Sequence, residues 1–295
     1  MFDPDDIDNR NLRWVKRLIA PLNLAERYHR ARVTGVDRVP DGAALFVGNH
    51  NGATLSIDTF LFALAYARER GEADLPYGLA HDLVLRIPGL NQFLAPLGVV
   101  RASPGNARRL FAAGRKVMVY PGGDVESMRS FCDRDRVTFD GRTGFARMAI
   151  EHGVPIVPVA AAGAHGTLLI LSSSKTLARR LGLERWLRIK VLPVALSLPW
   201  GLTVGPVPPY WPLPTGISIE VLEPIRPERT GPEAAADAAY VAQLAAQVEQ
   251  ALQEAVTRLS KERRAARRRR GWLRRRDHGA APGAGRQSRA TAGSG

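Results

Sequence analysis

The sequence predicts an α/β protein in which a mixed, largely parallel sheet is flanked by helices. Short apolar runs alternate along the chain with longer runs of helical periodicity. Polar residues follow several of the apolar runs directly, at the positions where the carboxyl ends of parallel strands would meet. The composition agrees, because 45% hydrophobic residues in a chain of 295 support a sizeable core.

The alternation gives the order of the elements. We expect strands over residues 43–47, 76–80, 97–101, 116–120, 155–160 and 217–222. We expect helices over residues 58–70, 83–94, 104–113 and 144–152, with a break at Pro88-Gly89 in the second. Asp58 suits the first turn of its helix because an acid there complements the helix dipole. Ser103 before Pro104 is a good start for the third helix.

The two ends of the chain carry further helices. Residues 9–32 predict an amphipathic helix, interrupted or kinked at Pro21, which either packs on the core or lies in a membrane interface with Trp14 at headgroup depth. Residues 232–270 predict a long helix that ends in an arginine-rich run. We therefore divide the chain into an N-terminal amphipathic segment (1–32), an α/β domain (33–257) and a polybasic, largely disordered tail (258–295).

The positive charge of the chain is concentrated in this tail. The net charge is +14, and from residue 258 onward 13 Arg and Lys residues stand against Glu262 and Asp277, which leaves +11 there and +3 in the body. A polybasic run of this kind attracts an anionic membrane surface. We expect no specific nucleic-acid partner, because the run has no interleaved aromatic residue beyond Trp272 and no folded reader module.

The compartment and the relation to the membrane follow from what the sequence lacks. A single cysteine, Cys132, excludes a disulfide framework and fits a reducing compartment. The N-terminus shows no signal peptide, and the uncharged stretch 191–214 holds seven prolines, which argues against a membrane span. We expect a peripheral protein on the cytoplasmic face of a membrane. Trp200, Tyr210 and Trp211 in that stretch suggest an acyl-chain groove, a membrane-contacting loop or a buried irregular segment.

The candidate site is assembled from motifs at the ends of four predicted strands. Asn49-His50 is followed by Asp58, a later strand delivers Arg101, and a third runs into Tyr120-Pro121-Gly122-Gly123 with Glu126 beyond it. The fourth is the strand Val154-Pro155-Ile156-Val157-Pro158-Val159. An imidazole beside a carboxylate is the minimum equipment for general-base catalysis near neutral pH.

This order of motifs resembles the glycerolipid acyltransferase superfamily over roughly residues 30–225. The chain departs from the usual spacing of a His, four residues and an Asp, because Asp58 comes eight residues after His50. A helix of that length rises about 12 Å, so residues 51–56 must form a loop if Asp58 is to orient His50. The Tyr-Pro-Gly-Gly sequence looks like the form found in relatives that acylate diacylglycerol and other neutral alcohols.

The resemblance implies a role for each site residue. His50 would take the proton of an acceptor hydroxyl that attacks the thioester of acyl-CoA or acyl-carrier protein, and Asp58 would fix the imidazole tautomer. Residues that would bind substrate are Tyr120, Pro121, Gly122, Gly123, Glu126, Arg101 as a phosphate ligand and, more weakly, Arg142. The acyl thioester is a co-substrate, and we expect no cofactor and no metal.

Several alternatives remain open at the level of sequence. His81 beside Asp82 either joins the site or caps a helix, and His165 either joins it or is structural. The acceptor is a lysophospholipid such as 1-acylglycerol-3-phosphate or, as an alternative, a neutral lipid such as diacylglycerol or a wax-type alcohol. A catalytically inactive, lipid-binding relative is the remaining alternative.

Overall fold

The computed structural model describes the backbone of residues 1–53, 55–182, 190–205 and 210–279, and the side chains of these residues except Leu177 and residues 269–279. The chain forms two compact units, Met1–Ser260 and Lys261–Gly295. The last helix, α11, spans Ala238–Gly279. The disorder expected at the far end of the tail falls on residues 280–295, which lie outside the described part.

The first unit is built on a seven-stranded sheet with the order β1-β10-β6-β2-β5-β3-β4. All pairs are parallel except β10 with β6, so the sheet is mixed and largely parallel, as the sequence predicts. The strands are β1 (Arg32–Thr34), β2 (Leu45–Gly48), β3 (Tyr77–Ala80), β4 (Val99–Arg101), β5 (Val117–Val119), β6 (Ile156–Ala162) and β10 (Ser218–Val221).

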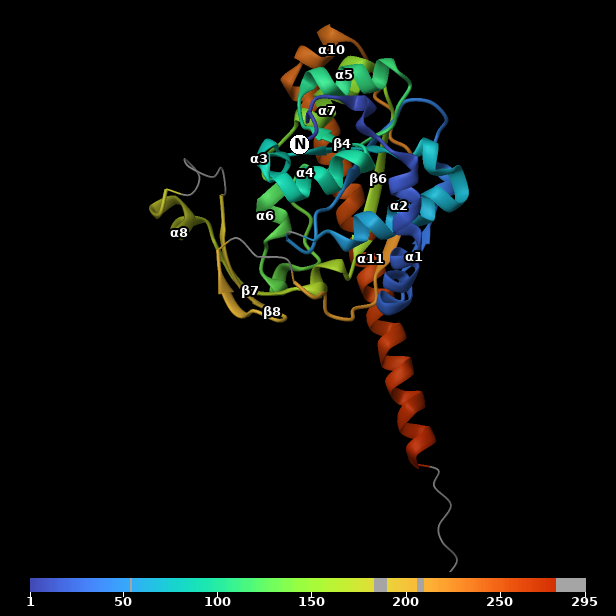
Figure 1. Cartoon of the computed structure of the whole chain (residues 1–295), viewed down its shortest axis with the longest axis vertical. Coiled ribbons are helices and arrows are strands. Elements are labelled where there is room, and N and C mark those ends of the chain that lie inside the picture. Colours follow the sequence, from blue (N-terminus) through green and yellow to red (C-terminus); the bar gives the residue numbers. More distant parts are fainter. Residues whose placement is uncertain (54, 183–189, 206–209, 280–295) are drawn as a thin grey trace, which may run out of the picture. The chain divides into compact units, whose positions relative to one another are not determined.

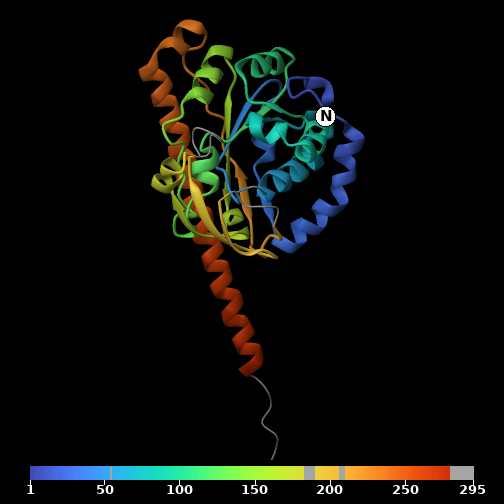
Figure 2. The same ribbon diagram turned by 60° about the vertical axis from the view of Figure 1, so that its left-hand side comes forward.

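Helices cover both faces of this sheet (Figures 1 and 2). Side chains alternate between the faces along each strand: Leu45 and Val47 of β2 pack with the described part of α11, while Phe46 packs with helices on the opposite face. The helices are α1 (Leu12–His29), α2 (Ile57–Arg70), α3 (Asp82–Arg86), α4 (Pro88–Leu94), α5 (Pro104–Ala112), α6 (Gly123–Ser127), α7 (Gly144–His152) and α10 (Pro232–Ala236).

The structure also contains a second, smaller sheet that the sequence did not predict. It has the order β7-β8-β9, formed by Leu169–Ser174, Leu192–Ser197 and Gly201–Val204, and β7 is followed by α8 (Lys175–Arg180). All its pairs are antiparallel. The many prolines of the 191–214 stretch favoured an irregular segment. Only Pro193 lies within a described strand, β8, and the other prolines fall outside the described strands.

The topology gathers the candidate motifs at one edge of the large sheet. Strands β2, β3, β4, β5 and β6 run parallel, so their carboxyl ends meet at the same edge. The loop after β2 carries His50, and β2 lies between β6 and β5 in the middle of the sheet. Loops at such an edge are held by a rigid scaffold and remain open to ligands.

Candidate active site

The loop that carries His50 is fixed where it leaves β2. The side-chain amide of Asn49 donates to the backbone oxygen of Ala161 at 2.9 Å, and its oxygen accepts from the backbone N–H of Ala161 at 2.8 Å. Asn49 therefore extends the pairing of β2 with β6 by one side chain. The next residue, His50, leaves the sheet with its backbone direction set.

Beyond His50 the chain turns sharply instead of starting a helix. Gly52 and Ala53 both have positive φ angles, +69° and +47°, a region that costs a residue with a Cβ some free energy. The turn is held by Tyr210, whose hydroxyl donates to the Gly52 oxygen at 2.7 Å, and by the Ala53 N–H, which donates to the Ser127 oxygen. Helix α2 begins only at Ile57, so the segment after His50 is a loop.

The imidazole of His50 is oriented by Ser56. Its Nδ1 lies 3.1 Å from the Ser56 hydroxyl oxygen, and that hydroxyl donates to the backbone oxygen of Asn51 at 3.2 Å. With its proton committed to Asn51, the hydroxyl can only accept from His50, so Nδ1 carries the hydrogen. Among the described residues nothing is hydrogen-bonded to Nε2, which is left as a proton acceptor on a partly exposed ring.

Asp58 lies in the first turn of α2 and is hydrogen-bonded to Asn51, whose side-chain amide donates to the Asp58 carboxylate at 2.8 Å. Within the part of the chain that the structure describes, no hydrogen bond or ion pair joins Asp58 to His50, although the spacing argument required a loop that would allow one. The two residues are instead connected through Asn51, which follows His50 in the chain and donates a hydrogen bond to Asp58. Any influence of Asp58 on His50 is therefore indirect.

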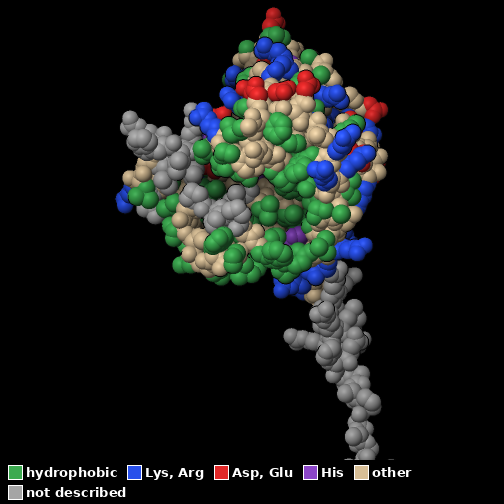
Figure 3. Space-filling model, in the orientation of Figure 1, with side chains coloured by type: hydrophobic (Ala, Val, Ile, Leu, Met, Phe, Trp, Pro, Cys, Tyr) green, Lys and Arg blue, Asp and Glu red, His purple; other side chains and the backbone are tan. Residues whose placement is uncertain are grey.

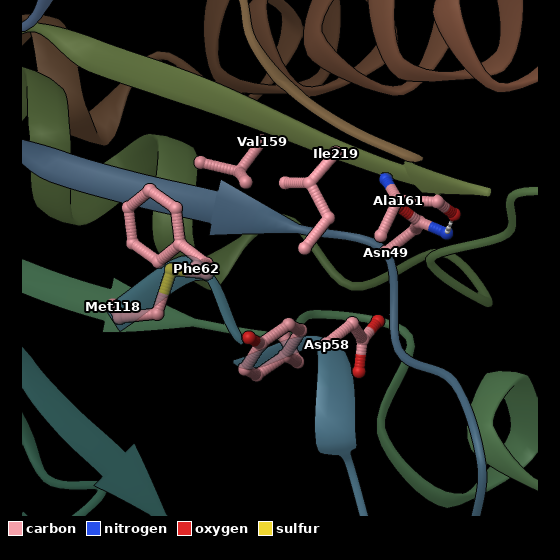
Figure 4. A pocket seen from close by; sticks show the side chains of 8 residues that line it. Asn49, Asp58, Phe62, Met118, Val159, Ala161 and Ile219 are labelled. Atoms are coloured by element: carbon pink, nitrogen blue, oxygen red, sulfur yellow. Dashed lines mark hydrogen bonds between the residues drawn. The ribbon is translucent and has the colours of Figure 1, made fainter. Parts of the chain in front are cut away.

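Asp58 lines a small pocket together with residues of the sheet (Figure 4). Asn49 and Asp58 lie toward one side of it, and Phe62, Met118 and Val159 toward the other. One carboxylate oxygen of Asp58 is buried and has no hydrogen-bond partner among the described residues. Burial raises the pKa of Asp58 to about 6, against the stabilising hydrogen bond from Asn51.

A buried arginine that sequence reasoning missed holds the site together. The guanidinium of Arg129 donates to the backbone oxygens of His50 and Glu126 and to the side-chain oxygen of Asn51. It also donates to the backbone oxygens of Asp133 and Arg134. Arg129 is 6% exposed. A signal existed in the sequence, since Arg129 follows Glu126 by three residues, the spacing of neighbours on one helical face, but it stood in a segment without any recognised motif.

The structure corrects the expectation that Glu126 binds acceptor hydroxyls. Glu126 is fully buried, and its two carboxylate oxygens accept from the backbone N–H groups of His50, at 2.8 Å, and Thr138, at 3.2 Å. Burial raises its pKa to about 7, and the Arg129 charge opposes this rise. Glu126 thus supports the His50 backbone and is not available to an acceptor.

The electrostatics of the site keep His50 neutral. Burial and the positive charge of Arg129 together lower the pKa of the imidazole to about 4. A neutral imidazole with a free Nε2 is the form that a general base requires. Near neutral pH His50 is therefore in its proton-accepting state before any substrate binds.

The Tyr120-Pro121-Gly122-Gly123 loop packs beside His50. The Tyr120 ring lies 4.9 Å from the imidazole centroid, and its hydroxyl bonds that of Thr59 at 2.5 Å. Gly122 leaves no space for a Cβ beside the Glu126 side chain and the Thr138 oxygen. The N–H of Gly123 is donated to the Tyr120 oxygen, so this group of the expected substrate cradle is already used within the turn.

Arg142 contacts the backbone of the Tyr120-Pro121-Gly122-Gly123 loop. Its guanidinium donates to the Pro121 oxygen at 2.8 Å and pairs with Asp124 at 3.1 Å. Pro121 itself contributes its backbone oxygen to this contact. The structure therefore brings Arg142 to the predicted loop, where it holds the backbone in place.

Arg101 and His81 lie farther along the edge. Arg101 is the last residue of β4, which is an edge strand of the sheet. Two strands, β5 and β3, lie between β4 and β2, so the axes of β4 and β2 are about 14 Å apart. The Arg101 guanidinium pairs with Asp82 at 3.2 Å and with Asp5 at 3.5 Å. His81 caps α3, its Nδ1 accepting from the Leu83 N–H, so the capping alternative describes it.

His165 is buried next to the network. Its Nε2 lies 2.8 Å from the backbone oxygen of Arg129, and the side chain is 1% exposed. Burial, with the nearby Arg129 charge, lowers its pKa to about 3. His165 is therefore a neutral donor to Arg129, which matches the structural alternative.

The described residues contain neither a metal-binding cluster nor a membrane-spanning helix. No group of three or more His, Cys, Asp or Glu residues in that part of the chain is arranged to hold a metal ion. None of its helices is both long and apolar enough to cross a membrane.

Comparisons with known proteins agree with one another. Residues 30–162 match the family model described as Acyltransferase. The fold is similar to the crystal structure of a 1-acyl-sn-glycerophosphate acyltransferase, PlsC, from Thermotoga maritima, with a TM-score of 0.50 and 17% identity over 83% of this chain and 78% of that one.

The curated relatives differ in how much is known of them. An uncharacterized protein of Mycobacterium tuberculosis is 33% identical over 239 residues, which are 80% of this chain and 63% of the relative. A Gallus gallus protein named as a DGAT1/2-independent enzyme synthesizing storage lipids is 29% identical over 133 residues, 45% of this chain and 38% of that protein. The chain thus spans less than two thirds of the length of these relatives.

Proposed function

The acyltransferase family model matches residues 30–162, and from that match we propose that this chain is a glycerolipid acyltransferase, which transfers a fatty acyl group from an acyl thioester to a glycerolipid hydroxyl. The observation that carries the proposal is the state of His50. Its Nδ1 donates a hydrogen bond to Ser56, its pKa is lowered, and its Nε2 has no hydrogen-bond partner among the described residues.

The reaction needs only one side chain to move the proton. Nε2 of His50 accepts the proton of the acceptor hydroxyl as its oxygen attacks the thioester carbonyl. The tetrahedral intermediate then collapses, the carbon–sulfur bond breaks, and the thiolate leaving group takes the proton from the imidazolium. Acyl-CoA and acyl-carrier protein both supply such a thioester, and no covalent enzyme intermediate is required.

The remaining groups position the base. Ser56 fixes the tautomer of the His50 ring. The backbone N–H of His50 donates to Glu126, and its backbone oxygen accepts from Arg129. Asp58 contacts the loop through Asn51. The charge of Arg129 disfavours the imidazolium form of His50. Once formed, this imidazolium therefore readily gives its proton to the leaving thiolate. Asp58 thus acts as a positioning residue in this proposal, a change from the direct partner expected from the spacing.

The acceptor is a neutral glycerolipid such as diacylglycerol in our preferred form of the proposal. Arg101, the phosphate ligand implied by the resemblance, is paired with two carboxylates and lies at the far strand of the sheet. The similarity to the storage-lipid enzyme supports the same acceptor class. A phosphate-bearing acceptor such as 1-acylglycerol-3-phosphate is the second candidate, because the similar fold of PlsC belongs to an enzyme named for that acceptor. Acceptors of either class reside in membranes, so we place the protein at a membrane surface, on the cytoplasmic face.

The test is acyl transfer from radiolabelled acyl-CoA, and in parallel from acyl-carrier protein, to vesicles that contain diacylglycerol or lysophosphatidate. We expect His50→Ala to lower transfer by a factor of about 100 to 10,000. The control is His152→Ala, which removes a histidine from the last turn of α7. Transfer that persists in His50→Ala, or that is absent with every donor and acceptor, would turn the assignment toward a lipid-binding relative.

A further inference from the structure

The small sheet presents an apolar outer face. Leu196 of β8 is paired with Leu169 of β7 on one side and with Leu202 of β9 on the other, and Val194 is paired with Val204. Directly paired side chains project from the same face of a sheet. Leu196 is 47% exposed, and Leu202 and Val204 are each 64% exposed. This face is therefore a row of large aliphatic side chains in contact with solvent.

The inner face of the same sheet is already covered. Ile170 and Ala195 are fully buried and pack with Leu168, Tyr210 and Ala53 of the His50 loop. An antiparallel sheet with one covered face normally carries polar residues on the other, whereas a sheet that is apolar on both faces has a partner on both. The outer face thus lacks a partner within the described residues.

The apolar surface continues past the tip of the sheet to α1. Leu198, at the end of the β8–β9 hairpin, is bridged to Trp211, and the next residue, Pro212, accepts a hydrogen bond from Tyr28. Figure 3 shows apolar side chains along the lower edge, over the region of β7 and β8 and the loop beside it. We call this surface the apolar edge and define it by six exposed residues: Leu24, Leu196, Leu198, Trp200, Leu202 and Trp211.

Basic residues flank the apolar edge. Arg27 and Arg30 are exposed beside Leu24 and Tyr28 at the end of α1, and every charged side chain that α1 exposes is basic. Arg179 and Arg180 are exposed in α8, which follows the other end of β7. Apolar side chains with exposed tryptophans, bordered by arginines, match the layers of a bilayer surface that contains anionic lipid.

We propose that the apolar edge docks on an anionic lipid bilayer, with the aliphatic and Trp side chains in the interfacial layer and the flanking arginines on the headgroups. The inference rests on the proposed function, which requires access to a lipid acceptor. The docked surface is tied to the catalytic loop, because Tyr210, adjacent to Trp211, donates its hydroxyl to Gly52. Docking brings the loop of His50 to the membrane surface.

The first experiment measures insertion with the full chain, without acyl donor or acceptor. Vesicles contain phosphatidylcholine with or without phosphatidylglycerol, and brominated acyl chains quench tryptophans that enter the bilayer. We expect quenching on the anionic vesicles, and we expect Trp200→Phe together with Trp211→Phe to remove most of it. Fluorescence that brominated lipid leaves unchanged overturns the proposal.

The second experiment measures affinity by vesicle flotation at a salt concentration that screens the polybasic tail. We expect Leu198→Ser with Leu202→Ser to weaken binding at least about tenfold, since two large side chains lose their burial. The control is Ile87→Ser, which removes an exposed aliphatic side chain away from the apolar edge, at the junction of α3 and α4; Ile87 is 47% exposed, against 54% for Leu198 and 64% for Leu202. Equal loss in the control variant overturns the proposal.

The remaining outcomes separate docking from catalysis and from self-association. A chain that inserts but transfers no acyl group refutes the proposed function alone, and an active chain that binds vesicles only through its tail refutes the docking surface alone. If the Leu198→Ser, Leu202→Ser variant changes the mass of the particle in solution while its vesicle binding is unchanged, the apolar edge joins two copies of the chain and the proposal is wrong.

Discussion

At the scale of single residues, the partner of His50 is the most consequential feature of the site. Ser56 takes the place next to Nδ1 that an acid was expected to fill, and its own hydrogen bond to Asn51 sets the direction of the relay. A serine relay fixes the tautomer without adding a negative charge beside the ring. It therefore orients the base but does little to stabilise the imidazolium once it forms.

Ser56→Ala tests this relay. We expect kcat to fall about tenfold to hundredfold with little change in KM, because the ring loses its preferred orientation while substrate contacts remain. Ser56→Thr keeps the hydroxyl and should restore most of the rate. The measurement is steady-state acyl transfer with the wild type and both variants. Equal KM increases in the two variants would instead indicate a role in packing the loop.

Asp58 makes a separate prediction for stability. Its folded pKa of about 6 lies above 3.8, the ordinary value of an aspartate side chain. The folded state therefore binds this proton more tightly, so the contribution of Asp58 is most favourable at low pH and is lost as pH rises from about 4 through 6. Two pKa units correspond to about 3 kcal/mol.

Asp58→Asn removes this titration while keeping an oxygen for Asn51. The free energy of unfolding of Asp58→Asn relative to wild type should therefore increase by about 2 to 3 kcal/mol between pH 4 and pH 8. Urea unfolding of both proteins across this range gives the difference directly. A difference that stays constant with pH would show that the carboxyl of Asp58 does not titrate as its burial requires.

At the scale of elements, the His50 loop depends on the close packing of α6. Gly122 lies against Glu126, whose carboxylate holds the His50 N–H, and no Cβ fits at this position. Gly144, at the start of α7, has open space around its Cβ position. The two glycines therefore provide a matched pair.

Gly122→Ala should lower stability by about 1 to 3 kcal/mol, because the added carbon must displace Glu126 or the Thr138 backbone. Acyl transfer should fall with it, since the displaced Glu126 releases the His50 backbone. Gly144→Ala should be neutral or slightly stabilising. Thermal unfolding and activity of both variants are the measurements, and indistinguishable variants would argue against close packing at Gly122.

At the scale of the whole molecule, the chain separates a compact body from a basic extension. The first unit ends at Ser260, and the sequence from Lys261 onward carries most of the net positive charge. Electrostatic attraction of a basic segment to anionic lipid is screened by salt, whereas burial of apolar side chains is not. The tail and the apolar edge should thus differ in their response to ionic strength.

Deletion of residues 261–295 tests this separation. We expect the thermal unfolding of the body to change little, and we expect binding to phosphatidylglycerol vesicles to weaken at low salt and to lose most of its salt dependence. Flotation across a salt series, with the full chain as control, measures both. If vesicle binding changes neither with the deletion nor with the content of anionic lipid, a membrane role for the tail is excluded.

Six of the seven strands of the larger sheet were predicted from the sequence because their signals are local, whereas β1 (Arg32–Thr34) was missed because its three residues form no apolar run. Each of the six apolar runs is short and bounded by turn residues, and the polar residues that follow mark the strand ends. The break at Asp237 between α10 and α11 and the β8–β9 hairpin were missed, since an Ala-rich run favours an uninterrupted helix and prolines disfavour strands. The roles of Arg129 and Glu126 were missed because both depend on contacts with the His50 backbone, 79 and 76 residues away in the sequence.

The sequence by itself determined the fold class, the resemblance to an acyltransferase family and the position of His50 at the end of a central strand. All three follow from periodicity and from motifs within short windows, where local interactions dominate. Only the tertiary structure decided which groups surround His50. Ser56 reaches Nδ1 because the chain turns through positive φ at Gly52 and Ala53, and Arg129 reaches the His50 backbone from a helix end 79 residues away. Hydrogen-bond partners across such distances are fixed by packing, which no local pattern records.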